Sequence, residues 1–537
     1  MTLVPGYVAA PWLTSGQRGR WRVSHTGLLS RQRKDDAPFE SRGVTLAVLS
    51  LSVLIINLDG TILNVALPSI VRDLHATSTQ LQWVVDAYII VLAGLLLIAG
   101  SLGDHWGRKR VFLIGLLVFG VGSALSAFST STGSLIAARA FMGVGGAAVM
   151  PSTLSILTNV FREPHDRARA IGLWSGTNGL GLALGPLIGG WLLAHYWWGS
   201  VFLINVPIVL VTGVAALVAI PDSRNADAAA PDVVGAVLSL VGVSSLLWGI
   251  IEAPSRGWTS PLILAAIVGA VVVVTSLVWW ERRSSHPLVE LAFFRKRRFS
   301  VAMGGLALTL FALSGTMFLL TQYLQFSLGY SPFQTGLRIT PIALVLIVVA
   351  SVSTTLARYA GSKVVVVAGM VLIALGLQLL STVTIHTTYT DALPAFFLLG
   401  IGSGLAIAPC TDAVMGSVPN HLAGIGSATN STALQIGSAL GVAVIGSLLN
   451  TRYQSRVDLL VSGHGAPAPV VAVIRSSLGG ALAVAQRAGG AVGAQLALAA
   501  RQSFLAGLDF AVDVAAAIVA AAALIVAVLL PARAPKD

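Results

Sequence analysis

Long apolar stretches alternate with short polar connections along nearly the whole chain. Each stretch has about 20 residues, the length at which an α-helix crosses the hydrocarbon core of a bilayer. The pattern predicts an all-α integral membrane protein with 14 membrane-spanning helices, so both termini should lie on the same side. The expected helices cover residues 44–66, 82–102, 111–129, 134–159, 170–194, 200–220, 233–252, 260–280, 299–323, 333–356, 362–385, 392–415, 427–449 and 508–531.

Charge strengthens this interpretation and orients the helices. Only 10% of the 537 residues are charged, against about 25% in soluble proteins. The net charge of +12 could suggest nucleic-acid binding. However, the basic residues gather in short loops, such as 108–110 and 295–298, that alternate with nearly uncharged ones. This is the positive-inside pattern, so we expect these loops and both termini in the cytoplasm, no nucleic-acid partner, and a bacterial-type inner or plasma membrane.

An internal repeat predicts the domain organisation. Residues 102–122 align without gaps to residues 356–376, as expected when a transporter is built from two related halves. We therefore expect six-helix bundles at 44–220 and 299–531, joined by a segment (221–298) with two extra helices. A basic cytoplasmic arm (1–43) and a tail (532–537) flank them. The second bundle should include an extracellular loop at 450–507, with an amphipathic helix near 468–503.

The loop GSLGDHWGRKR, at residues 100–110, resembles the signature loop between helices 2 and 3 of the major facilitator superfamily. The resemblance implies that family's fold and transport by alternating access. It also suggests a cytoplasmic gate made of Asp104, Arg108 and Lys109. The internal repeat places Arg358 opposite Asp104, as a charge pair between the halves. Alternatively, the positive charge only keeps the loop inside the cell.

Three charged residues lie within predicted spans: Asp59, Asp86 and Arg139. A carboxyl group in hydrocarbon must hold a proton or pair with a cation, and an arginine there needs an anionic partner or water. We expect Asp59 to choose between a proton and the cargo, and Arg139 to tune Asp59 or Asp86. Structural alternatives are local polar packing of Asp59, a hydrated helix end for Asp86 and snorkelling of Arg139. The segments around all three resemble the fourteen-helix drug:proton antiporters.

Glycines in the fifth span are spaced for close helix packing. Spacing of four residues presents a smooth helix face, and the proline allows a bend. Packing alone explains this pattern, but the full set resembles a motif of exporters in the same superfamily. Its residues are Gly181, Gly185, Pro186, Gly189 and Gly190.

The remaining candidate residues are weaker signals. Asp412 and Arg338 match the family pattern at the ends of two spans in the second half. Trp83 could belong to an aromatic pocket with Tyr88, Trp174, Phe318, Tyr323 and Phe326. Alternatively, these aromatic residues face lipid or pack between helices. Many relatives carry charges in span 13 where this chain has Ser431, Leu434 and Gln435. Proton handling should therefore depend on Asp59 and Asp86.

These observations predict a monomeric, proton-coupled exporter of small hydrophobic, often cationic, drugs or toxic compounds. One rival is an exporter or facilitator of a single metabolite, lipid or siderophore. Another is a membrane sensor that transports nothing. The single cysteine cannot form an intrachain disulfide, and no metal-ligand spacing, nucleotide-binding loop or nucleophile–base cluster is visible. We therefore expect no enzyme activity, no cofactor and no metal.

Overall fold

The computed structural model describes residues 39–224, 231–284, 287–419, 422–461 and 467–531. Fourteen helices in this part of the chain are long and apolar enough to cross a membrane, which confirms the predicted number. The first half contains α2 (Phe39–Leu74), α3 (Ser78–Trp106), α4 (Arg108–Ala127), α5 (Thr132–Val160), α6 (Pro164–His195), α7 (Ser200–Leu203) and α8 (Asn205–Ala219). The linker contains α9 (Val233–Arg256), α10 (Pro261–Glu281) and α11 (Leu291–Phe294).

The second half is built in the same way, from α12 to α19. Its first membrane helix, α12, continues into a short π-helix, η1, which allows the chain to turn into α13. These elements are α12 (Arg297–Gln322), η1 (Tyr323–Ser327), α13 (Pro332–Ala360), α14 (Ser362–Leu380), α15 (Tyr389–Met415), α16 (Ala423–Val461), α17 (Ala468–Ser476), α18 (Leu478–Ala488) and α19 (Gly490–Leu529).

Matching glycines support the internal repeat. Gly107 ends α3 and begins α4 with φ 110°, and Gly361 does the same between α13 and α14 with φ 89°. Glycine adopts this positive φ at little cost. Gly115 packs against α5 in the first half, and Gly369 packs against α15 in the second. The two halves therefore share their local geometry as well as their sequence pattern.

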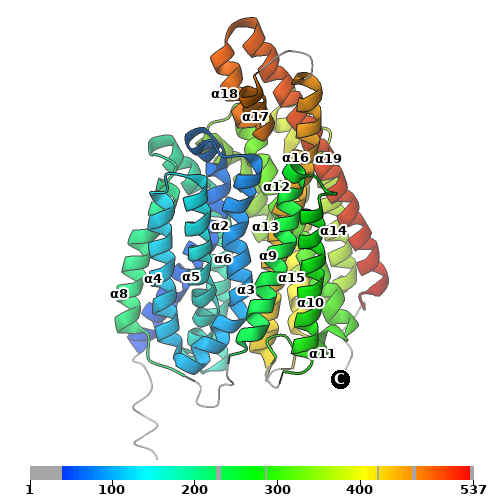
Figure 1. The fold of residues 1–537 in the computed structure, drawn as a ribbon. Coiled ribbons are helices and arrows are strands. Elements are labelled where there is room, and N and C mark those ends of the chain that lie inside the picture. Colours follow the sequence, from blue (N-terminus) through cyan, green and yellow to red (C-terminus); the bar gives the residue numbers. More distant parts are fainter. Residues whose placement is uncertain (1–38, 225–230, 285–286, 420–421, 462–466, 532–537) are drawn as a thin grey trace, which may run out of the picture.

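The two ends of the molecule differ in character. The turn between α3 and α4 lies at the lower end in Figure 1, together with the start of α2 and the end of α19. We call this the loop end. Helices α17 and α18 lie at the opposite end, which we call the cap end. Both ends of the described helical domain thus share a side, as 14 spans require.

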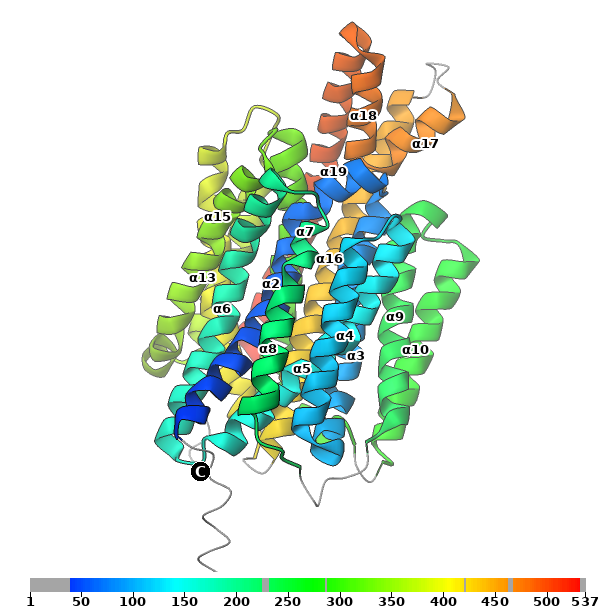
Figure 2. The ribbon, with the colours of Figure 1, turned by 90° about the vertical axis from the view of Figure 1, so that its left-hand side faces the viewer.

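The segment predicted as a loop at 450–507 is largely helical. Helix α16 continues to Val461 and α19 begins at Gly490, so both extend past the other helices (Figure 2). Helices α17 and α18 connect them along the chain. The expected single amphipathic helix near 468–503 is replaced by α17, α18 and the start of α19. The arm (1–38) and the tail (532–537) lie outside the described residues.

The seam between the two halves is closed at the cap end and open at the loop end. Gly190 of α6 lies against Phe333 of α13, and Gly179 lies against Ile347. Gly176 and Gly172 continue the same stripe of α6 toward the loop end, at spacings that keep them on one face. A Cβ on either would meet nothing within 4 Å. The structure is therefore open toward the loop end.

Candidate functional site

A buried ion pair joins two of the predicted residues. Arg139 on α5 donates from Nη1 to Asp59 Oδ2 on α2 at 2.5 Å. The two side chains are only 1% and 0% exposed. Burying either charge alone would be costly, so each side chain can be buried as an ion only because the other neutralises it. Arg139 has therefore found an anionic partner, and Asp59 is paired with a fixed cation.

Neighbouring groups hold this pair in place. Asp59 Oδ1 accepts a hydrogen bond from the Asn205 side chain at 3.3 Å, and Asn205 also donates to Ser123. Arg139 Nε donates to the Val84 carbonyl at 3.1 Å, and its guanidinium lies 4.3 Å from the Tyr88 ring centre. Our sequence analysis missed these supports. The signal was present in Asn205, an isolated amide at the start of an apolar helix.

Asp86 lies in a different environment. It is fully buried, and neither carboxyl oxygen has a hydrogen-bond partner among the described residues. Gln82, one helical turn earlier on the same face, donates to the Val442 and Ala443 carbonyls of α16. Asp86 therefore lies on the α16-facing side of α3, between the two halves. A carboxyl group without donors is much less costly to bury as the neutral acid than as the carboxylate.

A cavity that is partly open to solvent lies between the halves. It is lined by four helices, two from each half, and its walls are mostly aliphatic. The lining residues are Thr61, Asn64 and Val65 of α2, Leu182 and Pro186 of α6, Leu313, Met317 and Thr321 of α12, and Ile339, Ile342, Ala343 and Leu346 of α13.

Asp59 does not line this cavity. An α-helix turns about 100° per residue, so Asp59 lies on roughly the opposite face of α2 from Thr61 and Asn64. The structure therefore gives no contact between Asp59 and this cavity, and the expectation that Asp59 chooses between a proton and the cargo stays a prediction. Asp59 is paired with Arg139 inside the first bundle, while α2 presents uncharged residues to the cavity.

The predicted glycine stripe packs α6 against α2. A Cβ at Gly181 would lie 2.8 Å from Asn57, one at Gly189 would lie 2.6 Å from Ile62, and one at Gly185 would clash with Thr61. Gly190 instead faces α13, where a Cβ would lie 2.7 Å from the Pro332 carbonyl. Pro186 lines the cavity. Through this motif, α6 contacts α2, which carries Asp59, lines the cavity at Pro186, and packs against α13 at the seam between the halves.

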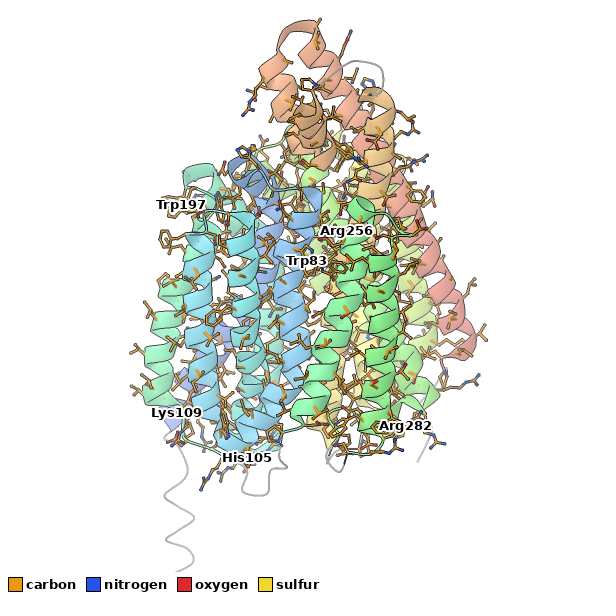
Figure 3. The ribbon with its side chains drawn as sticks, viewed as in Figure 1. Trp83, His105, Lys109, Trp197, Arg256 and Arg282 are labelled. Carbon is orange, nitrogen blue, oxygen red and sulfur yellow. The ribbon has the colours of Figure 1, made fainter. Side chains whose placement is uncertain are left out.

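Lys109, one of the predicted gate residues, lies at the loop end (Figure 3). Asp104 pairs with Arg108 at 2.7 Å, and Arg108 also donates to the Ser155 carbonyl of α5. Lys109 donates to the Leu217 carbonyl of α8 at 2.9 Å. Arg358 is exposed in the last turn of α13, and the described residues contain no ion pair between it and Asp104. In this state, the charged loop is bound within its own half.

The weaker candidates lie elsewhere. Trp83 donates to Glu252 of α9, which also pairs with Arg256, as Figure 3 helps to locate. Arg338 stacks on Tyr330 with its guanidinium 3.9 Å from the ring centre, and Asp412 is exposed at the end of α15. None of the six proposed aromatic residues is among the described residues that line the cavity, and an aromatic pocket stays a prediction. The residues in question were Trp83, Tyr88, Trp174, Phe318, Tyr323 and Phe326.

Comparison with known proteins places this geometry in context. Residues 49–442 match the family model of the Major Facilitator Superfamily. The chain is 36% identical to the multidrug efflux pump LfrA of Mycolicibacterium smegmatis, over 90% of this chain and 95% of that protein. It is also 36% identical to the tetracenomycin C resistance and export protein of Streptomyces glaucescens, with 76% of each chain covered.

The fold is similar to that of a solved transporter. A bacterial homologue of the human lysosomal transporter Spinster, in an inward-facing and unoccupied conformation, aligns with a TM-score of 0.65. The alignment covers 93% of this chain and 100% of that one, at 16% sequence identity. At this identity the likeness concerns the fold alone.

Proposed function

Because the chain belongs to the major facilitator superfamily, we propose that it exports hydrophobic toxic compounds in exchange for protons, by alternating access. The chain is a multi-pass membrane transporter by family. Two relatives named for drug efflux and antibiotic export support the direction and the cargo class. The loop end would face the cytoplasm of a bacterial-type cell membrane, with both termini on that side.

The Asp59–Arg139 pair carries this proposal. While Asp59 is charged it neutralises Arg139, and the pair is sealed from solvent. A proton arriving at Asp59 would remove that neutralisation and leave the buried guanidinium without its counter-ion. The resulting penalty favours a rearrangement of α2 against α5. Proton binding is thereby linked to a change in the packing of the first half.

The gate residues would act when the loop end closes. In the described state the seam is open there, and Asp104 is bound to Arg108. Closure would bring Arg358 toward Asp104, replacing a local pair with one between the halves. The closed seam at the cap end lies within one chain, so a monomer is sufficient for this cycle.

The test is transport of a fluorescent drug into acid-loaded proteoliposomes, with the pH gradient as the only driving force. Wild-type protein should accumulate the drug, and Asp59→Asn should abolish gradient-driven accumulation while leaving drug binding intact. Asp73→Asn is the matched control, because Asp73 lies on the same helix but is exposed at its end. Undiminished gradient-driven transport by Asp59→Asn would refute the proposal.

A further inference from the structure

The cavity between the halves combines an aliphatic wall with an absence of charge. None of the described residues that line it is ionisable, and the polar side-chain groups among them are two hydroxyls and one amide. A permanent cation transferred into such a site loses its hydration without gaining a counter-charge. The lining therefore favours cargo that enters without net charge.

The carboxylates nearest in sequence to the cavity residues do not compensate. Asp59 lies on the far face of α2, already paired with Arg139. Asp86 is completely buried on the α16-facing side of α3. On α6, α12 and α13, the ionisable residues are confined to the helix ends except Arg338. Arg338 stacks on Tyr330 outside the cavity lining, and a second cation would repel positive cargo in any case.

The polar groups of the cavity also differ in what they can offer. The Thr61 hydroxyl donates to helix carbonyls, including the Gly181 carbonyl at 3.2 Å, and the Thr321 hydroxyl donates to the Met317 and Phe318 carbonyls. Among the described residues, the Asn64 amide makes one long contact, of 3.5 Å, to the Gly60 carbonyl. Asn64 is thus the group best able to bind a polar atom of the cargo.

From this arrangement we infer that the cargo is an uncharged, largely apolar molecule that presents one hydrogen-bonding group to Asn64. The inference rests on the proposed export function and narrows its cargo class from hydrophobic, often cationic, compounds to neutral ones. It has a consequence for energetics. When neutral cargo leaves and a proton enters, one positive charge crosses inward per proton, so the membrane potential drives the cycle as well as the pH gradient.

The experiment compares two probes of nearly identical shape in purified full-length protein in nanodiscs. They are 4-(4-dimethylaminostyryl)pyridine, which is neutral at pH 8, and its N-methylpyridinium cation. Binding is followed by probe fluorescence. The neutral probe should bind at least about tenfold more tightly than the cation. Equal or tighter binding of the cation by the wild-type protein would overturn the inference.

A substitution sharpens the test. Asn64→Asp places a carboxylate in the cavity and should shift the preference toward the cation by about tenfold or more. Asn159→Asp, the same change at the loop end of α5 and outside the cavity lining, should leave the preference unchanged. An unchanged preference in Asn64→Asp would place the probe elsewhere and contradict the inference. If that variant does not fold, the wild-type preference still decides.

A transport assay separates this inference from the proposed function. At zero pH gradient, a potassium diffusion potential should drive movement of the neutral probe through wild-type protein, in the direction set by the voltage. Voltage-insensitive but gradient-driven transport would contradict uncharged cargo while retaining proton exchange. Preferential binding of the neutral probe without transport under either gradient would support the cargo class and refute the proposed function.

Discussion

Removing one partner of the Asp59–Arg139 pair should destabilise the protein far more than removing both. In Asp59→Asn, Arg139 keeps its hydrogen bond to the Val84 carbonyl and its stacking on Tyr88, but loses its counter-charge. Two unit charges about 4 Å apart interact by about 4 kcal/mol at an effective dielectric constant of 20. Breaking buried pairs typically costs about 3–5 kcal/mol. We expect a loss in this range.

The double variant isolates the interaction. Arg139→Met alone strands the Asp59 carboxyl, and Asp59→Asn alone strands the guanidinium. Together they leave no uncompensated charge, so the combined loss should be smaller than the sum by about 3 kcal/mol. The free energy of unfolding in mixed micelles measures all four corners of this cycle. Additivity within about 0.5 kcal/mol would refute the mutual neutralisation of the two groups.

Transport separates stability from coupling. The double variant should regain stability but not gradient-driven accumulation, because its neutral pair has no carboxyl group to protonate. Binding of the neutral probe serves as the control for an intact cavity. Restored gradient-driven transport in the double variant would show that another group carries the proton.

Three further predictions concern other parts of the molecule. Asp86→Asn replaces a carboxyl group that has no hydrogen-bond partner among the described residues. The free energy of unfolding should therefore change by less than about 1 kcal/mol, while gradient-driven transport falls. A loss of stability as large as that of Asp59→Asn would contradict this. Asp104→Asn removes a partly exposed ion pair, so it should lower the free energy of unfolding by less than about 1 kcal/mol. It should nevertheless slow transport, and an unchanged transport rate would exclude the proposed gate. Gly336→Val would clash with the Pro186 carbonyl and should open the cap end. A cysteine introduced by Thr335→Cys, at a position buried in the described state, should then react several-fold faster with an impermeant maleimide. The buried Cys410 should add little background. An unchanged reaction rate would argue against a closed seam at the cap end.

The sequence was sufficient for features that depend on local pattern. Hydrophobic length gave the number of membrane helices, because a bilayer imposes it. The repeat correctly matched Gly107 with Gly361, since both positions need the same positive φ. The requirement that a membrane arginine finds an anion left Asp59 and Asp86 as candidate partners of Arg139, and the structure pairs it with Asp59. These are constraints that one or two residues express on their own.

Features that depend on helix rotation and packing could not be predicted. Whether Asp59 faces the cavity is decided by how α2 turns against α5 and α6, and the apolar residues on all its sides leave that angle open. The partners of the aromatic residues could not be predicted for the same reason, since Tyr88 turns toward Arg139 and Trp83 toward Glu252. Segment 450–507 read as a loop because its small residues have no continuous apolar run, yet they continue two membrane helices.

The placement of Asp59 and Asn64 on opposite sides of α2 bears on how such a protein can diversify. Their positions are only about 7.5 Å apart along the helix axis, at 1.5 Å per residue, yet they face different surroundings. Mutations that reshape the cavity wall would leave the Asp59 carboxyl and its Arg139 partner untouched. The chemistry of the cavity could therefore change during evolution without altering the Asp59–Arg139 pair, because the two lie on opposite faces of the same helix, α2.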